Sequence, residues 1–243
     1  MTVEPEQAAR MVALRAGRGP LRLVVFDCDG VLIDSEGLSN RVVAQELGEL
    51  GWPITGEQSE RLFIGMSLPD MQPLIERQLG RKLPPGWADR LAVRVTAAMA
   101  VEVEPMPGAA EALSATEALG LDWRVASNSS RLEMEAKFAR TGLAGRVRGR
   151  LHGIDDVMAE GRRGKPAPDL FLRAASSAGV DPAACLVLED SVLGARAAAA
   201  AGMTCLGFRP DGDPAPLAHE GALVFRALSE LPLLLRAAMQ VGK

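Results

Sequence analysis

The chain has 243 residues, of which 48% are hydrophobic and 4% are aromatic, and its formal net charge is −4. This length allows one large domain or a core domain with a smaller insert, and the hydrophobic fraction is ample for a sizeable core. With 27 basic residues against 31 acidic ones, the chain has no basic footprint for a nucleic acid. No apolar stretch approaches the ~18 residues that a membrane span needs, and we expect no membrane partner.

The N-terminal residues and the cysteines indicate the compartment. Residues 1–20 lack the apolar segment of a signal peptide, and we expect them to form a loosely ordered tail or a short amphipathic helix. Cys28, Cys185 and Cys205 all lie in apolar surroundings, which is typical of buried free thiols. Both features predict a protein of the reducing cytoplasm.

The first predicted strand is the unbroken apolar run Leu23–Phe26, which is typical of a strand buried on both faces. Asp27 and Asp29 follow it, and in an extended backbone residues i and i+2 point to the same side. At about 4 Å apart, two carboxylates repel each other by ~4 kcal/mol at an effective dielectric of about 20. Such a pair usually holds a cation, or keeps one carboxyl protonated for acid–base chemistry.

The next segment, residues 36–104, is predicted to be entirely helical. Apolar residues recur at spacings of three and four over 36–50. Thr55, with Gln58 three residues later, forms a capping-box pattern that begins a second helix, ending near residue 64. A helical module of roughly 70 residues lies within the size range of a small domain. The remaining helices of the module are expected at 71–79 and 87–101, after a loop at 65–70.

From residue 105 on, strands and helices alternate, which predicts a parallel, doubly wound sheet with right-handed crossovers. The expected fold class is therefore α/β, with a Rossmann-like core and an inserted all-helical domain. We expect a tail at 1–20, a core domain made of 21–35 and 105–243, and the helical domain at 36–104. The later strands are predicted at 123–127, 147–152, 184–188, 203–207 and 222–225, and the helices at 109–119, 131–141, 166–178, 192–201 and 229–239.

Two of these strands end in polar clusters, as the first strand does. Because ligands bind at the carboxyl ends of the strands in open α/β sheets, these clusters should converge on one edge, together with Asp27 and Asp29. The convergence predicts a ligand site at that edge. The two clusters are Ser127-Asn128-Ser129 and Glu189-Asp190.

The string DCDGVLIDS, from Asp27 to Ser35, resembles the first signature of the haloacid-dehalogenase-like (HAD) phosphohydrolases. It is most similar to the helical-cap (C1) branch, which contains sugar-phosphate phosphatases and β-phosphoglucomutases. A second string, GKPAPD at 164–169, resembles the third motif of the same family. The resemblance spans about 21–227 and implies a Rossmann-like HAD core with an all-helical cap domain.

The resemblance also implies roles for the core residues. It makes Asp27 the nucleophile that forms an aspartyl-phosphate, and Asp29 the general acid and then the general base. Ser127, with backbone N–H groups near Asn128 and the positive end of the next helix, would hold a phosphoryl oxygen. Lys165 would offset the carboxylates and bind the transferring phosphoryl group.

A Mg²⁺ site is implied at the same edge, since Mg²⁺ favours oxygen ligands. Its protein ligands would be Asp190, Asp27 and the backbone carbonyl of Asp29. Glu189 would contact these ligands and not the ion itself. As neighbours at a strand end, Glu189 and Asp190 should point in different directions, so only one of them is expected to join the Asp27 site. The two histidines are far apart in the sequence and are expected at the surface, so no zinc site is indicated.

Substrate contacts from the cap are expected at Gly65 and Ser67. Two nearby positions depart from the β-phosphoglucomutase pattern, because Ser39 replaces a histidine and Leu68 replaces an arginine. Those groups help a mutase to gate its site and to hold a second phosphate, so their absence favours a plain phosphatase. Closure of the cap would exclude bulk water until the phosphoenzyme forms.

The expected function is a Mg²⁺-dependent phosphatase acting on a small phosphorylated metabolite, such as a sugar or sugar-acid phosphate, as a monomer or weak homodimer. Three alternatives stay open. A phosphomutase needs a second phosphate clamp, a haloacid dehalogenase needs neither Asp29 nor Mg²⁺, and a catalytically silent HAD-like binding protein needs no intact site. The last is disfavoured because a silent site has no reason to tolerate the repulsion between Asp27 and Asp29.

Overall fold

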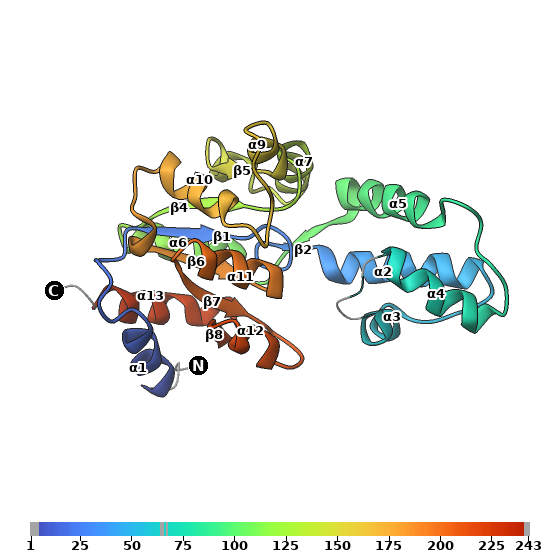
Figure 1. The fold of residues 1–243 in the computed structure, drawn as a ribbon, viewed down its shortest axis with the longest axis horizontal. Coiled ribbons are helices and arrows are strands. Elements are labelled where there is room, and N and C mark those ends of the chain that lie inside the picture. Colours follow the sequence, from blue (N-terminus) through green and yellow to red (C-terminus); the bar gives the residue numbers. More distant parts are fainter. Residues whose placement is uncertain (1–4, 64–65, 67, 241–243) are drawn as a thin grey trace. The chain divides into compact units, whose positions relative to one another are not determined.

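The protein is described by a computed structural model over residues 5–63, 66 and 68–240 (Figure 1). The chain divides into two compact units. The first, called here the α/β unit, runs up to Ile33 and resumes at Pro105. The second, called the helical unit, is Asp34–Glu104.

A six-stranded sheet forms the centre of the α/β unit, and all of its neighbouring strands pair in parallel. The strand order is β5-β4-β1-β6-β7-β8, so the chain's first strand lies in the middle. This arrangement confirms the predicted α/β fold class. The strands are β1 (Leu23–Phe26), β4 (Asp122–Ala126), β5 (Leu151–His152), β6 (Cys185–Glu189), β7 (Thr204–Phe208) and β8 (Leu223–Phe225).

Helices cover both faces of this sheet, which explains the unbroken apolar run of β1. Leu23 and Val25 belong to one hydrophobic cluster with side chains of α10 (Asp169–Ser177) and α11 (Val192–Ala200). Ala174, Ala175, Ala197 and Ala198 are buried there, so small side chains let these helices approach the strands closely. The other helices of the unit's later half are α7 (Arg131–Arg140), α8 (Ala144–Val147), α9 (Ile154–Met158) and α12 (Ala215–His219), with short 3-10 turns at Pro182–Ala184 and Leu228–Glu230.

The opposite face is covered by α6 (Ala109–Ala118) and α13 (Leu231–Met239), which pack against each other. Trp123 is the strand partner of Val24, and its indole Nε1 donates to Oε1 of Glu117 in α6 at 2.9 Å. Trp123 also packs edge-to-face on Phe26, with ring centroids 6.2 Å apart. Aromatic packing and a satisfied indole N–H therefore fix α6 on this side of β1 and β4.

The residues before β1 include helix α1 (Pro5–Leu14), which corresponds to the amphipathic-helix alternative. It packs against α13 and β8. Met11 and Arg15 are fully buried, and the Arg15 guanidinium donates to the Gly19 carbonyl at 2.8 Å and to Thr204 Oγ1 at 3.2 Å. This segment is therefore part of the packed α/β unit.

The helical unit contains α2 (Ser35–Glu49), α3 (Gly56–Phe63), α4 (Leu68–Leu79) and α5 (Trp87–Glu102). Helix α2 packs against both α3 and α5, and α4 packs against α5. The predicted capping box is present, because the Thr55 N–H donates to Gln58 Oε1 at 2.8 Å and the Gln58 N–H donates to Thr55 Oγ1 at 3.2 Å. Trp87, the first residue of α5, donates to Glu46 of α2 at 3.1 Å and is almost fully buried.

The two chain segments that join the units pair as a two-stranded ladder of β2 (Ile33–Asp34) and β3 (Glu104–Pro105). Sequence patterns missed this short pair, since two residues are too few for a periodicity. They also placed residue 68 in a loop, whereas α4 begins there. The predicted strand at 147–152 shrinks to β5, because Gly149 turns the chain with a φ of 73°. Within the described ranges, no helix has the length and apolar character of a membrane span.

Candidate active site

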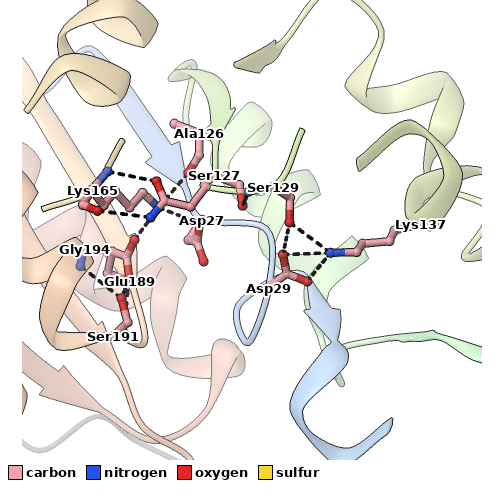
Figure 2. Close-up of polar contacts among 11 residues, drawn as sticks. Asp27, Asp29, Ala126, Ser127, Ser129, Lys137, Lys165, Glu189, Ser191 and Gly194 are labelled. Carbon is pink, nitrogen blue, oxygen red and sulfur yellow. Dashed lines mark hydrogen bonds and ion pairs between the residues drawn. The ribbon is translucent and has the colours of Figure 1, made fainter. Parts of the chain in front are cut away.

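The carboxyl ends of three neighbouring strands bring the polar clusters together. Strand β1 lies between β4 and β6, with Phe26 in register with Val125 on one side and Leu188 on the other. The ladder continues one residue further, since the Asp27 N–H donates to the Leu188 carbonyl at 2.9 Å. Asp27, Ser127 and Glu189 therefore arrive at the same edge of the sheet, as Figure 2 shows.

Lys165 occupies the centre of this edge. Its ammonium Nζ lies 2.6 Å from Oδ1 of Asp27, 2.5 Å from Oε1 of Glu189 and 2.8 Å from the carbonyl oxygen of Ala126. The Lys165 side chain is 4% exposed and the Glu189 side chain 0%. All three donors of the ammonium thus have an acceptor, so a buried, fixed positive charge joins two buried carboxylates.

The backbone of Lys165 is held by Asn128. The Lys165 N–H donates to Asn128 Oδ1 at 2.8 Å, and Asn128 Nδ2 donates to the Lys165 carbonyl at 3.2 Å. A Cβ at Gly164 would lie 2.5 Å from Asn128 Oδ1, so a glycine is needed beside this amide pair. The Asn128 side chain therefore positions the lysine loop. Ser127 is buried beside it, and its Oγ accepts from the Ser129 N–H at 3.0 Å.

The charge states at this edge follow from burial and from Lys165. Burial raises the pKa of Asp27 to about 7; Lys165 opposes that rise, and Glu189 and Asp29 add to it. Burial acts to lower the pKa of Lys165, but Asp27 and Glu189 outweigh it and leave the pKa above its usual value. Lys165 therefore stays charged at neutral pH, and Asp27 depends on neighbouring cations for its ionisation.

Glu189 and Asp190 both join the cluster, which corrects the expectation that only one would. Carboxylate oxygens of Asp27, Glu189 and Asp190 all lie within 4.8 Å of one another. A Cβ on Gly30 would lie 1.9 Å from Oδ2 of Asp190, so the positive-φ glycine after Asp29 leaves the space that the Asp190 carboxylate fills. Gly30 thus leaves room at the tip of β1, and the Asp190 carboxylate from the end of β6 occupies it beside the Asp27 group.

Glu189 is held from both ends. Its Oε1 accepts from Lys165, and its Oε2 accepts from the Ser191 N–H at 3.2 Å and the Ser191 hydroxyl at 2.9 Å. A Cβ on Gly194 would lie 1.8 Å from the Glu189 carboxyl carbon. The Glu189 carboxylate is thus pressed against the first turn of α11 with both oxygens occupied.

The acidic cluster is compatible with a divalent metal ion. Its donors are carboxylate oxygens, and among the described residues no cysteine or histidine belongs to it. Such a hard donor set suits Mg²⁺, which prefers oxygen ligands and retains several waters. Asp27, Glu189 and Asp190 each offer one carboxylate oxygen to this donor set, and Glu189 also accepts from Lys165 and Ser191.

Asp29 belongs to a second ion pair, which the sequence analysis did not foresee. Lys137 of α7 places its Nζ 2.7 Å from Oδ1 and 2.9 Å from Oδ2 of Asp29, and 3.1 Å from Ser129 Oγ. Ser129 Oγ also donates to Asp29 Oδ2 at 2.8 Å. Figure 2 shows the Asp29 carboxylate pointing toward Lys137 and Ser129, apart from the Asp27–Lys165 group. The two aspartates predicted to share one environment therefore each have their own lysine.

A sequence signal for Lys137 does exist. Met134 and Phe138 are buried on the inner face of α7, and Lys137 lies between them on the same stripe at helical spacing. A lysine on a buried stripe is rare unless it is paired, so its position predicts a carboxylate partner. Which carboxylate it meets depends on the tertiary fold.

The two histidines lie in different environments. His152, expected at the surface, is buried at the end of β5, where Nε2 lies 3.0 Å from Ser177 Oγ, because α10 covers this edge of the sheet. His219 is exposed, as expected. Gly65 and Ser67 lie outside the described residues, so their assignment as substrate contacts stays a prediction.

Comparison with known proteins places this geometry in a family. Residues 21–202 match the family model "haloacid dehalogenase-like hydrolase". The chain is 29% identical over 221 residues to the 6-phosphogluconate phosphatase of Escherichia coli, with 89% of this chain and 96% of the relative covered. It is also 29% identical over 194 residues to the fructose-1-phosphate phosphatase of that organism, covering 76% of this chain and 95% of the relative.

Solved structures give the same result. A HAD family hydrolase from Deinococcus radiodurans, crystallised with bound phosphate and sodium, is 35% identical with a TM-score of 0.78, and 91% of this chain and 98% of that chain are covered. A haloacid dehalogenase-like protein from Agrobacterium tumefaciens is 31% identical with a TM-score of 0.79, covering 89% and 98%. These matches confirm the resemblance drawn from the motifs, and the chain belongs to the haloacid dehalogenase-like hydrolases.

Proposed function

We propose that this chain is a Mg²⁺-dependent phosphatase that hydrolyses a small phosphorylated metabolite through an aspartyl-phosphate on Asp27. The observation that carries the proposal is the buried Lys165 bridge between Asp27 and Glu189, with Asp190 in the same cluster. A fixed cation beside a carboxylate cluster lets an anionic phosphate ester approach a carboxylate nucleophile. The phosphatase relatives support this chemistry.

In the first half-reaction, a carboxylate oxygen of Asp27 attacks phosphorus, and the bond from phosphorus to the ester oxygen breaks. Asp29 gives its proton to the departing ester oxygen, so the alcohol leaves neutral. Lys165 offsets negative charge around the transferring group. Ser127, with the N-terminal end of α7 behind it, binds a phosphoryl oxygen.

In the second half-reaction, water attacks the phosphorus of the aspartyl-phosphate, and Asp29 accepts its proton as general base. The bond from phosphorus to the Asp27 oxygen breaks, which releases inorganic phosphate and restores the carboxylate. Mg²⁺, when held by Asp27, Asp190 and the backbone carbonyl of Asp29, supplies further charge neutralisation for the phosphoryl oxygens. Glu189 keeps Lys165 in position throughout.

The substrate is proposed to be a sugar or sugar-acid phosphate. Relatives named for 6-phosphogluconate, fructose 1-phosphate and hexitol phosphates support this class. We further infer a cytoplasmic monomer or weak homodimer. Its three free cysteines are buried, and burial raises the pKa of the Cys28 and Cys205 thiols, which suits a protein that is never cross-linked by disulfides.

The test is phosphate release from 4-nitrophenyl phosphate and from a panel of sugar and sugar-acid phosphates, with Mg²⁺ or with a chelator. We expect release only with Mg²⁺, and a loss of more than about 10³-fold in Asp27→Asn, because the nucleophile is removed. Asp34→Asn is the matched control, since Asp34 caps α2 by accepting from the Gly37 N–H, and Asn is an equally good cap. Acid quenching during turnover should trap phosphate on the wild-type protein and none on Asp27→Asn.

Each alternative has its own outcome in this assay. Isomerisation of a sugar phosphate without net release would identify a phosphomutase. Halide release from a haloacid without metal would identify a dehalogenase. If no product forms under any condition, the catalytically silent binding protein is the alternative that remains.

A further inference from the structure

The Lys137 side chain is buried in the α/β unit and is not used by the mechanism above. It extends from the second turn of α7 and is 7% exposed, and its ammonium donates to Oδ1 and Oδ2 of Asp29 and to Oγ of Ser129. An ammonium has three donors, so these acceptors account for all of them. The contact links the turn after β1 to the turn after β4 and to α7 (Figure 2).

This ion pair differs from a surface salt bridge. A lysine is seldom buried without a partner, and a buried ion pair is often no more stable than an apolar pair of the same volume. Fold stability alone is therefore a weak reason for a lysine at this position, on a helix stripe otherwise occupied by Met134 and Phe138. A requirement for a fixed positive charge beside Asp29 is a stronger reason for a lysine at position 137.

The geometry limits where the Asp29 carboxylate can lie. Both of its oxygens are bound by Lys137, and Oδ2 also accepts from Ser129. If Asp29 moved away, a buried ammonium would lose its counter-charge, so the observed position is strongly favoured. A general acid–base group must be held within a fraction of an ångström to transfer its proton efficiently.

We propose that Lys137, assisted by Ser129, is a positioning residue that holds Asp29 for proton transfer to the leaving group and from water. The inference rests on the proposed function, in which Asp29 has that role. When the protonated form of Asp29 gives its proton to the ester oxygen, it becomes the carboxylate that forms the ion pair with Lys137. When water attacks the aspartyl-phosphate, Asp29 takes the proton back and the charge is removed.

This role predicts a defect that depends on the leaving group. Benzyl phosphate releases an alcohol whose oxygen needs a proton as the bond breaks, whereas 4-nitrophenyl phosphate releases a stable anion that does not. Both probes are small aromatic monoesters, so changes in binding affect them alike. The kcat/KM ratio reports the steps up to the first irreversible transfer, before the shared hydrolysis of the phosphoenzyme.

The experiment compares Lys137→Met, Lys137→Arg and the control Arg140→Met on both probes with Mg²⁺. Arg140 is exposed in the same helix, so its replacement removes one positive charge without touching Asp29. General acid catalysis is worth about 10²–10⁴-fold, so Lys137→Met should lower kcat/KM at least about 30-fold for benzyl phosphate and less than about 3-fold for 4-nitrophenyl phosphate. Lys137→Arg should recover part of the loss, and Arg140→Met should behave as wild type.

An equal loss on both probes, a gain on either, or no recovery in Lys137→Arg would overturn the inference. If Lys137→Met does not fold, Ser129→Ala replaces it and should show a smaller loss with the same dependence on the leaving group. If the wild type releases phosphate in a way that requires Mg²⁺ and Asp27, but the losses in the variants do not depend on the leaving group, only the role of Lys137 is refuted. The proposed function then stands. Absence of release in the wild type would refute both.

Discussion

The ammonium of Lys165 lies 2.6 Å from Oδ1 of Asp27 while it also contacts Glu189 at 2.5 Å. One buried positive charge thus serves two buried carboxylates, in a region where an unpaired charge is expensive. The arrangement explains how an acidic edge is tolerated before any phosphate or metal binds. It also makes Lys165 central to the stability of this edge and to the chemistry that we propose for it.

Lys165→Met should therefore reduce both properties. Removing one partner from a buried ion pair leaves uncompensated charge and costs about 3 kcal/mol of unfolding free energy, measured by urea denaturation at pH 7.5. The loss of a cation at the transferring group should also lower kcat by about 10²–10³-fold. The double variant Lys165→Met/Glu189→Gln should regain much of the stability without regaining activity. A double variant as unstable as the single one would contradict this view of the bridge.

Gly194→Ala should destabilise the protein although alanine favours helices. The new Cβ would overlap the Glu189 carboxyl group, whose carbon lies 1.8 Å from the Cβ position. Overpacking of this kind costs about 2 kcal/mol, and displacing Glu189 from Lys165 should lower kcat about 10-fold or more. Thermal unfolding and phosphate release measure the two effects.

Gly48→Ala is the matched control for this prediction. Gly48 lies in α2, and a Cβ there would meet nothing within 4 Å, so alanine should stabilise the protein by about 0.5–1 kcal/mol. If both variants gained stability, the close approach of Glu189 to Gly194 would not hold in solution.

Metal binding should be visible without turnover. A ligand that binds only the folded state stabilises it by about 2.7 kcal/mol at 100 times its Kd, so MgCl₂ should raise the melting temperature of the wild type. Asp190→Asn should lose most of this shift, because Asp190 is one of the three carboxylates in the cluster. Asp181→Asn is the control, since Asp181 caps a 3-10 turn at Ala183 away from the cluster. Equal shifts in all three proteins would place the ion elsewhere.

His152 should make stability fall in mild acid. Burial lowers its pKa to about 4, so the folded state keeps the ring neutral. The unfolded chain takes up a proton below about 6.5, so stability rises with pH between these values and is lost as pH falls from 6.5 toward 4. The free energy of unfolding should be about 2–3 kcal/mol lower at pH 4.5 than at pH 7.5.

The measurement is urea denaturation at pH 7.5, 6.5, 5.5 and 4.5 on the wild type and His152→Gln. The variant should lose less stability on acidification, because Gln carries no titrating ring. His219→Gln, which changes the chain's other histidine, is the matched control and should follow the wild type. Parallel curves for all three proteins would mean that His152 binds protons equally in both states.

The sequence allowed the strand tips to be located but not the contacts between them. The buried run of β1, the apolar run of β6 and the polar residues after each follow from local pattern, and parallel pairing brings them to one edge. The partner of Asp29 does not follow, because Lys137 is 108 positions away and reaches it only after α7 packs on the sheet. Tertiary packing likewise buries His152, which an isolated two-residue strand end gives no reason to expect.

The turn geometry at Gly30 shows a different limit. Strand alternation treats Asp27 and Asp29 as one pair, but the strand ends at Phe26, and Asp29 lies in an isolated bridge with Ile33. Glycine at positive φ then redirects the chain. The rule fails where the backbone leaves the sheet, which is also where the candidate chemistry lies.

The pairing of β2 with β3, and the hydrogen bond of 3.0 Å from the Met106 N–H to the Leu32 carbonyl, place the exit and the return of the chain side by side. The helical unit is therefore an insertion in the α/β unit, between Ile33 and Pro105. A short turn that joined Ile33 directly to Pro105 would leave the order of all six parallel strands unchanged. The helical unit can accordingly be exchanged or remodelled in evolution while the strands that carry Asp27, Ser127 and Glu189 keep their pairing.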